Sequence, residues 1–333
     1  MDVDWTSPEF LDRARAWTAE VLAGTGERLT GDWDQPHVRV WSSAVRFGST
    51  AGPVWFKVDS TGIRHEPALL AALGRHVPDL VPEVLGVEVD EAWSLTRDAG
   101  PVLRLLAPPD ELWDVWAAVL VRYADAQLAL ARAEVDVLAT GLPVVSTATI
   151  PGQLAALTEE LAGQPVEEGG LAPADADALR SALPEVQRWC DELAGLGVPD
   201  SVQHDDLHSA NVCGDGDASA ARIIDWGDAS WGSPLGTMLA TMNSIAWAAG
   251  LLVEGRPIEA PAVLRLRDAY LEPFTAYAGR DDLVRGVQLA RRTGCVGKAL
   301  SYRRALQDAP STVQVELDFP ERGWLLDLLD PAT

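Results

Sequence analysis

One segment, residues 204–228, constrains the fold of this chain more than any other. It reads HDDLHSANVCGDGDASAARIIDWGD, in which His204, Asp206 and Asn211 form an H-x-D-x-x-x-x-N pattern and Asp225 precedes a Trp-Gly pair. The apolar run before Asp225 is typical of a short strand, so its carboxylate is expected at a strand end, where it can bind a metal ion. Carboxylate and amide oxygens are the ligands that Mg²⁺ prefers. The segment therefore predicts two tight loops that present oxygen ligands.

These side chains suit phosphoryl transfer, which needs well-placed charges and a carboxylate beside the attacking hydroxyl. Asp206 is the candidate for that carboxylate, because it could accept the hydroxyl proton and orient the oxygen for in-line attack. Asn211 and Asp225 are the candidate Mg²⁺ ligands, and His204 is expected to brace the loop. Asp and Asn are also common turn residues, which each residue alone would fit. Their joint spacing matches the catalytic loop and the Asp-aromatic-Gly of kinases, which favours the catalytic interpretation.

Lysine is scarce in this chain, so the presence of a lysine at position 57 suggests a specific role. Of 26 Lys and Arg residues only Lys57 and Lys298 are lysines. Lys57 lies in the strand-like run VWFKV, and Glu66 follows nine residues later on an expected helix. A Lys57–Glu66 ion pair could hold the ammonium against nucleotide phosphates, although a surface salt bridge of little energetic value is the alternative. The apolar neighbours of Lys57 favour the functional interpretation.

A glycine-rich phosphate loop, G-x-G-x-x-G, does not precede Lys57. Ser42 and Ser43 instead lie between the first two expected strands, where their hydroxyls and backbone amides could contact phosphates. A plain hairpin turn is an equally good interpretation of this pair. A Gly-Pro step at residues 100–101 is a candidate hinge, so we expect a nucleotide-binding lobe over residues 1–97 and a catalytic and acceptor-binding lobe over residues 98–333.

Periodicity along the chain predicts a small antiparallel sheet with a helix, followed by a larger, mainly helical lobe, which is an α+β architecture. The expected strands are Val38–Ser42, Ala44–Gly48, Val54–Val58, Val84–Val89 and Trp93–Thr96. The expected helices are Ser7–Ala23, Arg64–Leu73, Asp110–Leu138, Gln153–Leu161, Pro173–Leu193, Pro234–Val253, Ala262–Tyr277 and Leu283–Leu306, with a short final segment around Trp324–Leu329.

Composition narrows the class of partner. A net charge of -24 and a pI near 4.4 argue against nucleic acid, whose phosphates are bound by clustered Lys and Arg. The acidity would attract a cationic small molecule, and a role in solubility alone is the alternative. Polar residues interrupt the most apolar stretch, so no membrane span is expected, and the acidic first residues lack the pattern of a secretory signal. The cytoplasm is therefore the expected location. Three well-separated cysteines indicate reduced, buried thiols.

The motifs HDDLHSAN and IIDWGDA, with Lys57 on a strand and Glu66 on the next helix, resemble the aminoglycoside phosphotransferase and choline kinase-like superfamily. The resemblance extends over roughly residues 38–306. It implies the two-lobed protein-kinase-like fold and transfer of the γ-phosphate of ATP or GTP, with Mg²⁺, to a hydroxyl of a small molecule. The acceptor is expected to be cationic, such as an aminoglycoside or another antibiotic, with an amino sugar, choline or an amino alcohol as alternatives.

The resemblance also implies roles for single residues. Asp206 corresponds to the catalytic base, Asn211 and Asp225 to the Mg²⁺ ligands, Lys57 to the phosphate contact and Glu66 to its partner. The hinge backbone at Leu95, Arg97 and Asp98 would contact the nucleobase. Asp205 stands where the family often has Gly, and Ser209-Ala210 where Pro-Gly is common.

Acceptor recognition is open to several interpretations. Asp205, Asp228 and Glu272 are candidate contacts for an acceptor ammonium, because carboxylates near the transfer site would bind it by charge-assisted hydrogen bonds; Glu272 fits a solvated helix residue at least as well. Two other classes of protein compete with an active kinase. The His-Asp pair at residues 204–205 could belong to a metal-dependent phosphohydrolase, but further histidine ligands are not close upstream. A kinase-like binding protein without activity is the other alternative.

Overall fold

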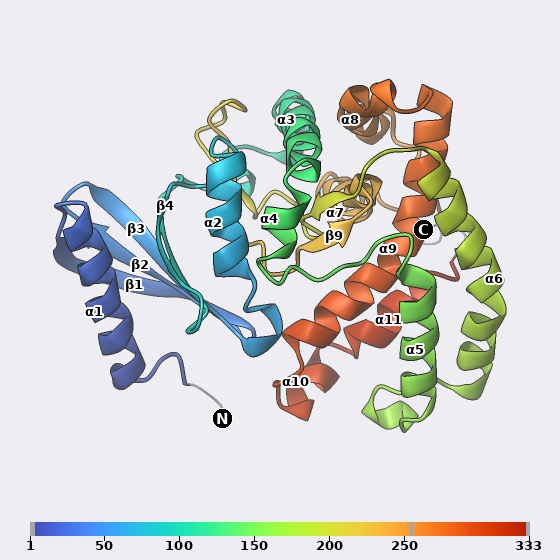
Figure 1. The fold of residues 1–333 in the computed structure, drawn as a ribbon, viewed down its shortest axis with the longest axis horizontal. Coiled ribbons are helices and arrows are strands. Elements are labelled where there is room, and N and C mark those ends of the chain that lie inside the picture. The colour runs from blue at the N-terminus through green and yellow to red at the C-terminus, as the bar shows by residue number, and fades with distance from the viewer. Residues whose placement is uncertain (1–3, 254–255, 331–333) are drawn as a thin grey trace.

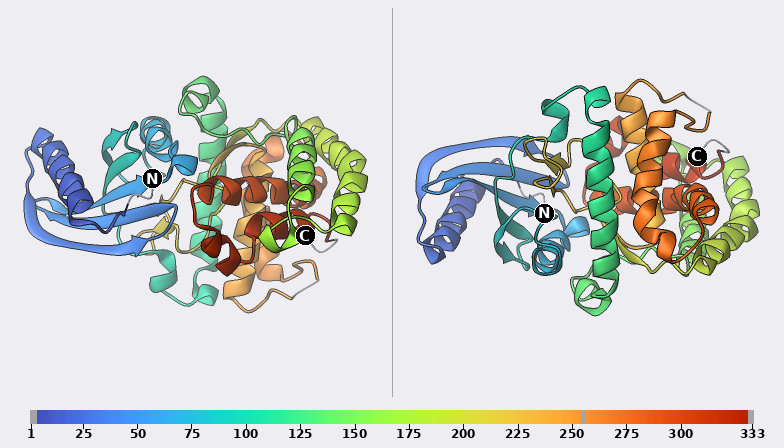
Figure 2. Two further views of the ribbon diagram at one scale, coloured as in Figure 1. Left: turned by 90° about the horizontal axis from the view of Figure 1, so that it is seen from below. Right: turned by 90° about the horizontal axis from the view of Figure 1, so that it is seen from above.

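The computed structural model describes residues 4–253 and 256–330; the outermost residues of both expected lobes lie outside this range. A sheet with two helices forms one end of the molecule, and a larger helical lobe forms the rest (Figure 1). Views from below and above show the same division along the long axis (Figure 2). The expected α+β architecture is therefore confirmed. Within the described residues, no helix is both long and apolar enough to cross a membrane.

The smaller lobe contains a five-stranded antiparallel sheet with strand order β1-β2-β3-β5-β4. One helix covers a face of the sheet, and a second leads toward the larger lobe (Figure 1). The elements are α1 (Pro8–Gly24), β1 (Leu29–Val38), β2 (Ser42–Ser49), β3 (Gly52–Asp59), a 3-10 turn (Thr61–Ile63), α2 (Glu66–His76), β4 (Val84–Glu88) and β5 (Trp93–Arg97).

Alternation along β3 decides which side chains face the site. Successive side chains of a strand point to opposite faces of the sheet. Phe56 is buried with Trp93 beneath Phe10 and Trp17 of α1, with ring centroids 5.3 to 6.3 Å apart. Lys57, one residue after Phe56, must therefore project from the opposite face of the sheet. Aromatic packing on the α1 side thus directs the lysine toward the rest of the molecule.

The first strand is longer than the sequence predicted, and the two serines lie elsewhere in the hairpin. The expected strand Val38–Ser42 is wrong, because pairing with β2 begins at Leu29. Ser42 and Ser43 already belong to β2, and the turn consists of residues 39–41. Pro36 and polar residues concealed this strand, which proline tolerates because β1 is an edge strand with a register shift at that point.

The larger lobe is built from helices around a few short strands. Its helices are α3 (Trp113–Ala131), α4 (Glu134–Leu138), α5 (Ile150–Ala162), α6 (Pro173–Gly195), α7 (Met238–Ala248), α8 (Pro261–Leu271), α9 (Arg280–Ala305), α10 (Ser311–Glu316) and α11 (Pro320–Asp327). Two short antiparallel pairs join β6 (Ser201–Gln203) to β9 (Ser230–Gly232) and β7 (Val212–Cys213) to β8 (Arg222–Ile223). Short 3-10 turns precede α3 and α7 and follow α8.

Three of the expected helices are shorter than the pattern indicated, and the one predicted over Ala262–Tyr277 ends at Leu271 before a 3-10 turn. The helix predicted over Asp110–Leu138 is divided after Ala131, where tight i to i+3 hydrogen bonds from residues 132 and 133 end α3. Neither glycine nor proline marks this break, so the sequence pattern could not show it. The helix predicted over Pro234–Val253 begins with a 3-10 turn and ends at Ala248. The cysteines are free and buried, as predicted.

Buried polar side chains hold the loop that carries the motif. Gln127 of α3 donates to the carbonyl oxygen of Val202 at 2.9 Å, and its own amide oxygen accepts from Tyr270 at 2.6 Å. The Tyr123 hydroxyl accepts from the backbone nitrogen of His204 at 2.9 Å. Such fully buried hydrogen bonds favour one backbone position, because breaking them without water is costly. The helical lobe thereby fixes the strand that leads into the motif.

Candidate active site

The hairpin of β7 and β8 explains how two distant motif residues meet. Val212 pairs with Ile223, and the backbone nitrogen of Ile224 donates to the carbonyl oxygen of Asn211 at 2.9 Å. Asn211 and Asp225 therefore stand next to each other at the open end of the hairpin, and the polar residues between the strands form its turn. Asp225 has a φ of 64°, a left-handed conformation that costs Asp less than most residues.

Asp206 lies beside Asn211 in the same loop. The Asn211 amide nitrogen donates to the carbonyl oxygen of Asp206 at 2.9 Å and to its Oδ2 at 3.3 Å. These bonds leave the Asn211 Oδ1 available to a metal ion. His208 Nε2 lies 3.1 Å from Asp206 Oδ2. Burial opposes ionisation of Asp206, but the His208 hydrogen bond and the charge of Lys298 outweigh it and hold its pKa well below the usual value.

His204 braces the site, as predicted. Its Nε2 donates to the Ile224 carbonyl oxygen at 2.9 Å, and its Nδ1 accepts from the backbone nitrogen of Asp206 at 3.3 Å. Burial lowers the pKa of this fully buried imidazole, which keeps it neutral. The Trp226 ring packs against it, with centroids 4.7 Å apart. His204 thus ties the two motif loops together.

Lys57 and Glu66 form the predicted ion pair, and it is much more than a surface contact. Lys57 Nζ lies 2.5 Å from Glu66 Oε2 and 2.6 Å from Asp225 Oδ1, and Asp59 Oδ1 is 3.4 Å away. Only 16% of the Lys57 side chain and 2% of the Glu66 side chain are exposed. The ammonium group of Lys57 thus links the smaller lobe to the motif.

Charge around Lys57 is unbalanced in a way that fits a divalent cation. Burial disfavours the ammonium, but Asp225, Asp59 and Glu66 outweigh it and raise the Lys57 pKa well above its usual value. One positive charge thus faces three carboxylates, and 44% of the Asp225 side chain is exposed. Within the described residues, no three His, Cys, Asp or Glu side chains form a metal site by themselves. Mg²⁺ typically uses one or two protein carboxylates and completes its ligands with phosphates, which these residues suit.

Gly227 gives Glu66 the space to bridge the two lobes. Glu66 Oε1 accepts from the Trp226 backbone nitrogen at 3.0 Å, while Oε2 contacts the lysine. A Cβ atom added at Gly227 would lie 3.0 Å from Glu66 Oε2 and 2.9 Å from Ile63 Cδ1. Glycine is therefore needed here for close packing.

Replacing Gly227 by Ala should displace the Glu66 carboxylate. We expect a loss of about 1–3 kcal/mol in the free energy of unfolding, which is the usual cost of overpacking, together with weaker nucleotide binding. Urea unfolding and nucleotide titration measure both effects. Gly152→Ala is the matched control, because a Cβ atom there meets nothing within 4 Å. Equal stability of the two variants would contradict this packing role.

Ser42 and Ser43, which the sequence offered as phosphate contacts, have hydrogen-bond partners within the sheet. Ser43 donates to the His37 carbonyl oxygen at 3.0 Å and accepts from Gln35 at 2.9 Å, and Ser42 lies 3.3 Å from His37 Nε2. Both hydroxyls are buried. His37, which the sequence did not single out, lies close enough to Asp225 and Lys57 for their charges to act on it, although burial dominates and lowers its pKa.

The hinge residues are tied into the smaller lobe. The Leu95 side chain is buried in the apolar core under the sheet. The backbone nitrogen of Arg97 donates to Glu83 at 2.9 Å, and its guanidinium pairs with Glu27 at 2.8 Å. Asp98 pairs with Arg46 at 3.2 Å. The side chains of this segment therefore stabilise the hinge itself.

The three candidate acceptor carboxylates have partners in the protein. Asp228 Oδ1 accepts a hydrogen bond from Ser301, and its Oδ2 lies 3.7 Å from Lys298 Nζ. Glu272 forms an ion pair with Arg280, with both side chains exposed. Glu272 thus has the environment of a solvated residue, which the sequence had left as its alternative interpretation.

Asp205 is the third of these carboxylates, and Ser230 is its hydrogen-bond partner. Its Oδ2 accepts from Ser230 at 2.5 Å, and its φ of 60° is left-handed. Burial raises the pKa of Asp205 to about 6, against the lowering effect of Ser230 and the nearby cations.

Replacing Asp205 by Asn should remove a pH dependence of stability. A carboxyl with a raised pKa in the folded state stabilises the fold below its unfolded pKa and loses that contribution as the pH rises through about 6. The free energy of unfolding of the wild type, relative to Asp205→Asn, should therefore fall between about pH 4 and pH 7, by at most about 3 kcal/mol. Chemical denaturation across this range measures it. A relative stability that rises with pH would contradict the assignment.

Sequence reasoning missed two charged groups of the site. Asp59 contacts Lys57 from the same strand, and Lys298 of α9 lies 3.5 Å from Asp206 Oδ1. The scarcity of lysine was the one available signal for Lys298, since both lysines of the chain stand at this site. Neither belongs to the H-x-D or Asp-Trp-Gly patterns.

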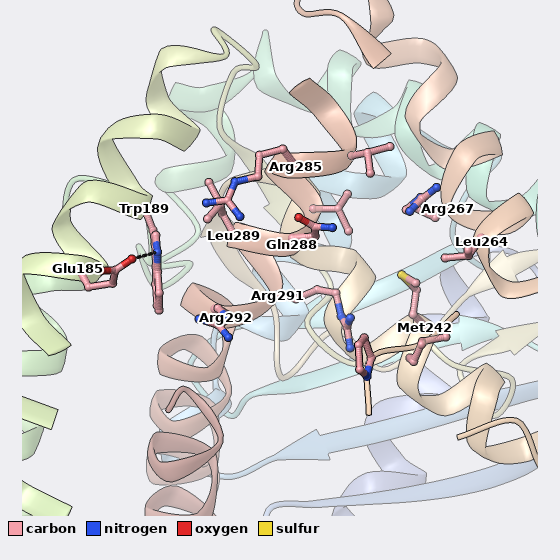
Figure 3. Close-up of a pocket in the computed structure, with 14 residues that line it drawn as sticks. Glu185, Trp189, Met242, Leu264, Arg267, Arg285, Gln288, Leu289, Arg291 and Arg292 are labelled. Carbon is pink, nitrogen blue, oxygen red and sulfur yellow. Dashed lines mark hydrogen bonds between the residues drawn. The ribbon is translucent and has the colours of Figure 1, made fainter. Parts of the chain in front are cut away.

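A separate cavity of about 450 Å³ lies between α6, α7, α8 and α9 (Figure 3). Figure 3 shows Arg285, Arg291 and Arg292 on α9, with Trp189 of α6 on one side and Met242 of α7 on the other. The described residues that line it include none of the predicted site residues. This cavity is thus distinct from the cluster around Asp206.

Comparison with known proteins bears on the family and the fold. A model of the phosphotransferase enzyme family matches residues 25–236, while no curated protein sequence matches. Among solved structures, the chain is similar to a macrolide 2'-phosphotransferase type I, with 16% identity, a TM-score of 0.58, and coverage of 96% of this chain and 98% of that one. The chain is also similar to a choline/ethanolamine kinase family protein from Mesorhizobium loti, with 16% identity, a TM-score of 0.58, and coverage of 96% of this chain and 99% of that one.

The GDP complex of wild-type aminoglycoside 2'-phosphotransferase-IIIa is also similar, with 14% identity, a TM-score of 0.57, and coverage of 92% of this chain and 98% of that one. At these identities the structural likeness shows the fold alone, which is the two-lobed fold of kinase-like phosphotransferases. The family model covers more than half of the chain and its matched range contains the motif loops. The chain belongs to the phosphotransferase enzyme family.

Proposed function

We propose that this protein transfers the γ-phosphate of ATP or GTP to a hydroxyl group of a small molecule. The observation that carries the proposal is the pair of linked clusters across the two lobes. Lys57 joins Glu66 to Asp225 on the nucleotide side, and Asp206 stands beside Asn211 on the other. Phosphoryl transfer depends on positioned charge more than on covalent chemistry, and these clusters supply it.

In the proposed reaction, the acceptor hydroxyl binds against the Asp206 carboxylate. The acceptor oxygen attacks the γ-phosphorus, the bond to the bridging oxygen breaks, and ADP or GDP leaves. The hydroxyl proton passes to Asp206. Because Asp206 is held ionised, its main contribution is to orient the hydroxyl, with proton acceptance late in the transfer.

Lys57 would bind phosphate oxygens of the nucleotide. Asn211 and Asp225 would hold Mg²⁺, which would neutralise charge on the phosphates when bound. The excess of carboxylates around Lys57 supports this assignment. At the hinge, the backbone nitrogens of Arg97 and Asp98 already donate within the sheet, so carbonyl groups of this segment would contact the base.

A nucleoside-diphosphate release assay tests the proposal. Mg-ATP and Mg-GTP are each combined with antibiotics, sugars, amino sugars and amino alcohols. Release of ADP or GDP is followed through a coupled dehydrogenase reaction. We expect acceptor-dependent release with at least one class. An inactive binding protein would bind nucleotide and release none with any acceptor, and a metal-dependent phosphohydrolase would act without nucleotide.

A further inference from the structure

Lys298, the second lysine of the chain, lies on the Asp206 side of the site. It stands in α9 and is 5% exposed. Its Nζ is 3.5 Å from Asp206 Oδ1 and 3.7 Å from Asp228 Oδ2. The rings of Tyr302 and Trp324 lie 5.5 and 6.0 Å from it. A buried ammonium thus joins carboxylates that come from two separate loops.

The contacts of Lys298 occupy the carboxylates that an acceptor ammonium would need. Oδ1 of Asp206 faces Lys298, and Oδ2 lies next to His208. Asp228 is held by Ser301 through one oxygen and by Lys298 through the other. An ammonium group binds tightly where a carboxylate offers it a free oxygen. These two carboxylates face a cation of the protein instead.

The third carboxylate, Asp205, also has partners in the protein. Asp205 accepts from Ser230, and the positive charges of Lys298 and Arg304 act on it. Arg304 is also close enough to Asp228 to interact with it. Two fixed cations therefore stand among three carboxylates on this side of the site, and one of these carboxylates orients the reacting hydroxyl.

We propose that Lys298 is a specificity-determining residue that selects an acceptor with an uncharged group next to the reacting hydroxyl, such as a sugar or polyol. The inference rests on the proposed function. An acceptor ammonium at this point would meet the Lys298 charge at short range, and like charges in an interface are strongly unfavourable. The overall acidity of the chain led us to expect a cationic acceptor, but next to the reacting hydroxyl we now expect an uncharged group.

Matched acceptor pairs test the inference. Glucosamine is compared with glucose, and choline with its uncharged analogue 3,3-dimethylbutanol, within the same release assay. The wild type should favour the neutral member of a pair by about tenfold or more in kcat/KM. Lys298→Met should shift that ratio toward the amine by about tenfold, since it frees the carboxylates, and Lys298→Arg should restore the wild-type preference.

A buried cation elsewhere on the same helix provides the control. Arg291 lies seven residues before Lys298, is 7% exposed, and donates to Asn243 Oδ1 at 2.8 Å beside the cavity of Figure 3. Arg291→Met should reduce thermal stability without changing the acceptor ratio. The ratio separates a role in specificity from a role in folding alone. If Lys298→Met does not fold, the kcat/KM ratios of the wild type for the neutral and amine acceptors still test the inference.

The outcomes separate the two proposals. A wild type that favours the amine in its productive pairs, or a folded Lys298→Met with an unchanged ratio, would overturn this inference and leave the proposed function in place. Nucleotide binding without phosphorylation of any acceptor would overturn the proposed function, and this inference with it.

Discussion

Replacing Asp206 by Asn should lower kcat about 10³-fold while nucleotide affinity changes little. The variant keeps the size of the side chain but loses the charge that, in the proposed reaction, orients the hydroxyl and accepts its proton; positioned general bases typically contribute a factor of about 10² to 10⁴. The proposed nucleotide contacts are spared, because Lys57 forms its ion pairs with Glu66 and Asp225 and not with Asp206. Steady-state kinetics and a nucleotide titration measure the two effects.

Asp215→Asn is the matched control for this substitution. Asp215 stands in the exposed turn between β7 and β8, where its Oδ1 accepts from the backbone nitrogen of Asp217 at 2.9 Å. An asparagine can accept the same hydrogen bond, so activity should stay at the wild-type level. Wild-type kcat in Asp206→Asn would show that another group activates the acceptor.

Lys57→Met should be damaging in two separable ways. We expect turnover to fall about 10² to 10³-fold, as when one positioned electrostatic group is removed from an active site. We also expect the free energy of unfolding to fall by about 3–5 kcal/mol, because buried Glu66 and Asp59 would lose their counter-ion. The fold thus depends on Lys57 more than a surface lysine would suggest.

A second substitution separates these effects. Lys57→Met combined with Glu66→Gln leaves one buried carboxylate fewer, so it should recover part of the stability and none of the activity. Burial raises the pKa of Asp59 and of Glu66. Their protonated forms therefore favour the folded state, and Lys57→Met should lose stability more steeply than the wild type as the pH rises. A double variant no more stable than Lys57→Met would contradict the counter-ion role.

The proximity of Asp206, Asn211 and Asp225 could be predicted because the pattern that carries them is local in the sequence. Asp206 and Asn211 are five residues apart, and the apolar run before Asp225 marks a strand end, so spacing alone placed all three. The ion pair of Lys57 and Glu66 was also predictable, since a strand and the next helix bring them together. Aromatic packing of α1 under the sheet then fixes the direction of the lysine.

Other parts of the site depend on contacts between distant segments. Lys298 meets Asp206 only after α9 packs against the motif loops, and no local pattern announces that contact. The start of β1 was missed because Pro36 and exposed polar residues hide an edge strand that pairing with β2 creates. Because of this pairing, Ser42 and Ser43 lie within β2 and not in the turn. The contacts of Asp228 with Ser301 and Lys298 likewise depend on the packing of α9.

The central claim is that Asp206 directs a γ-phosphate to an acceptor hydroxyl. Nucleotide labelled in its γ-phosphate is incubated with the most active acceptor from the release assay, and the products are separated by mass. The account predicts a phosphate ester of the acceptor with the wild type and at least about 10²-fold less with Asp206→Asn. Label found only in inorganic phosphate, or equal ester formation by the variant, would contradict it.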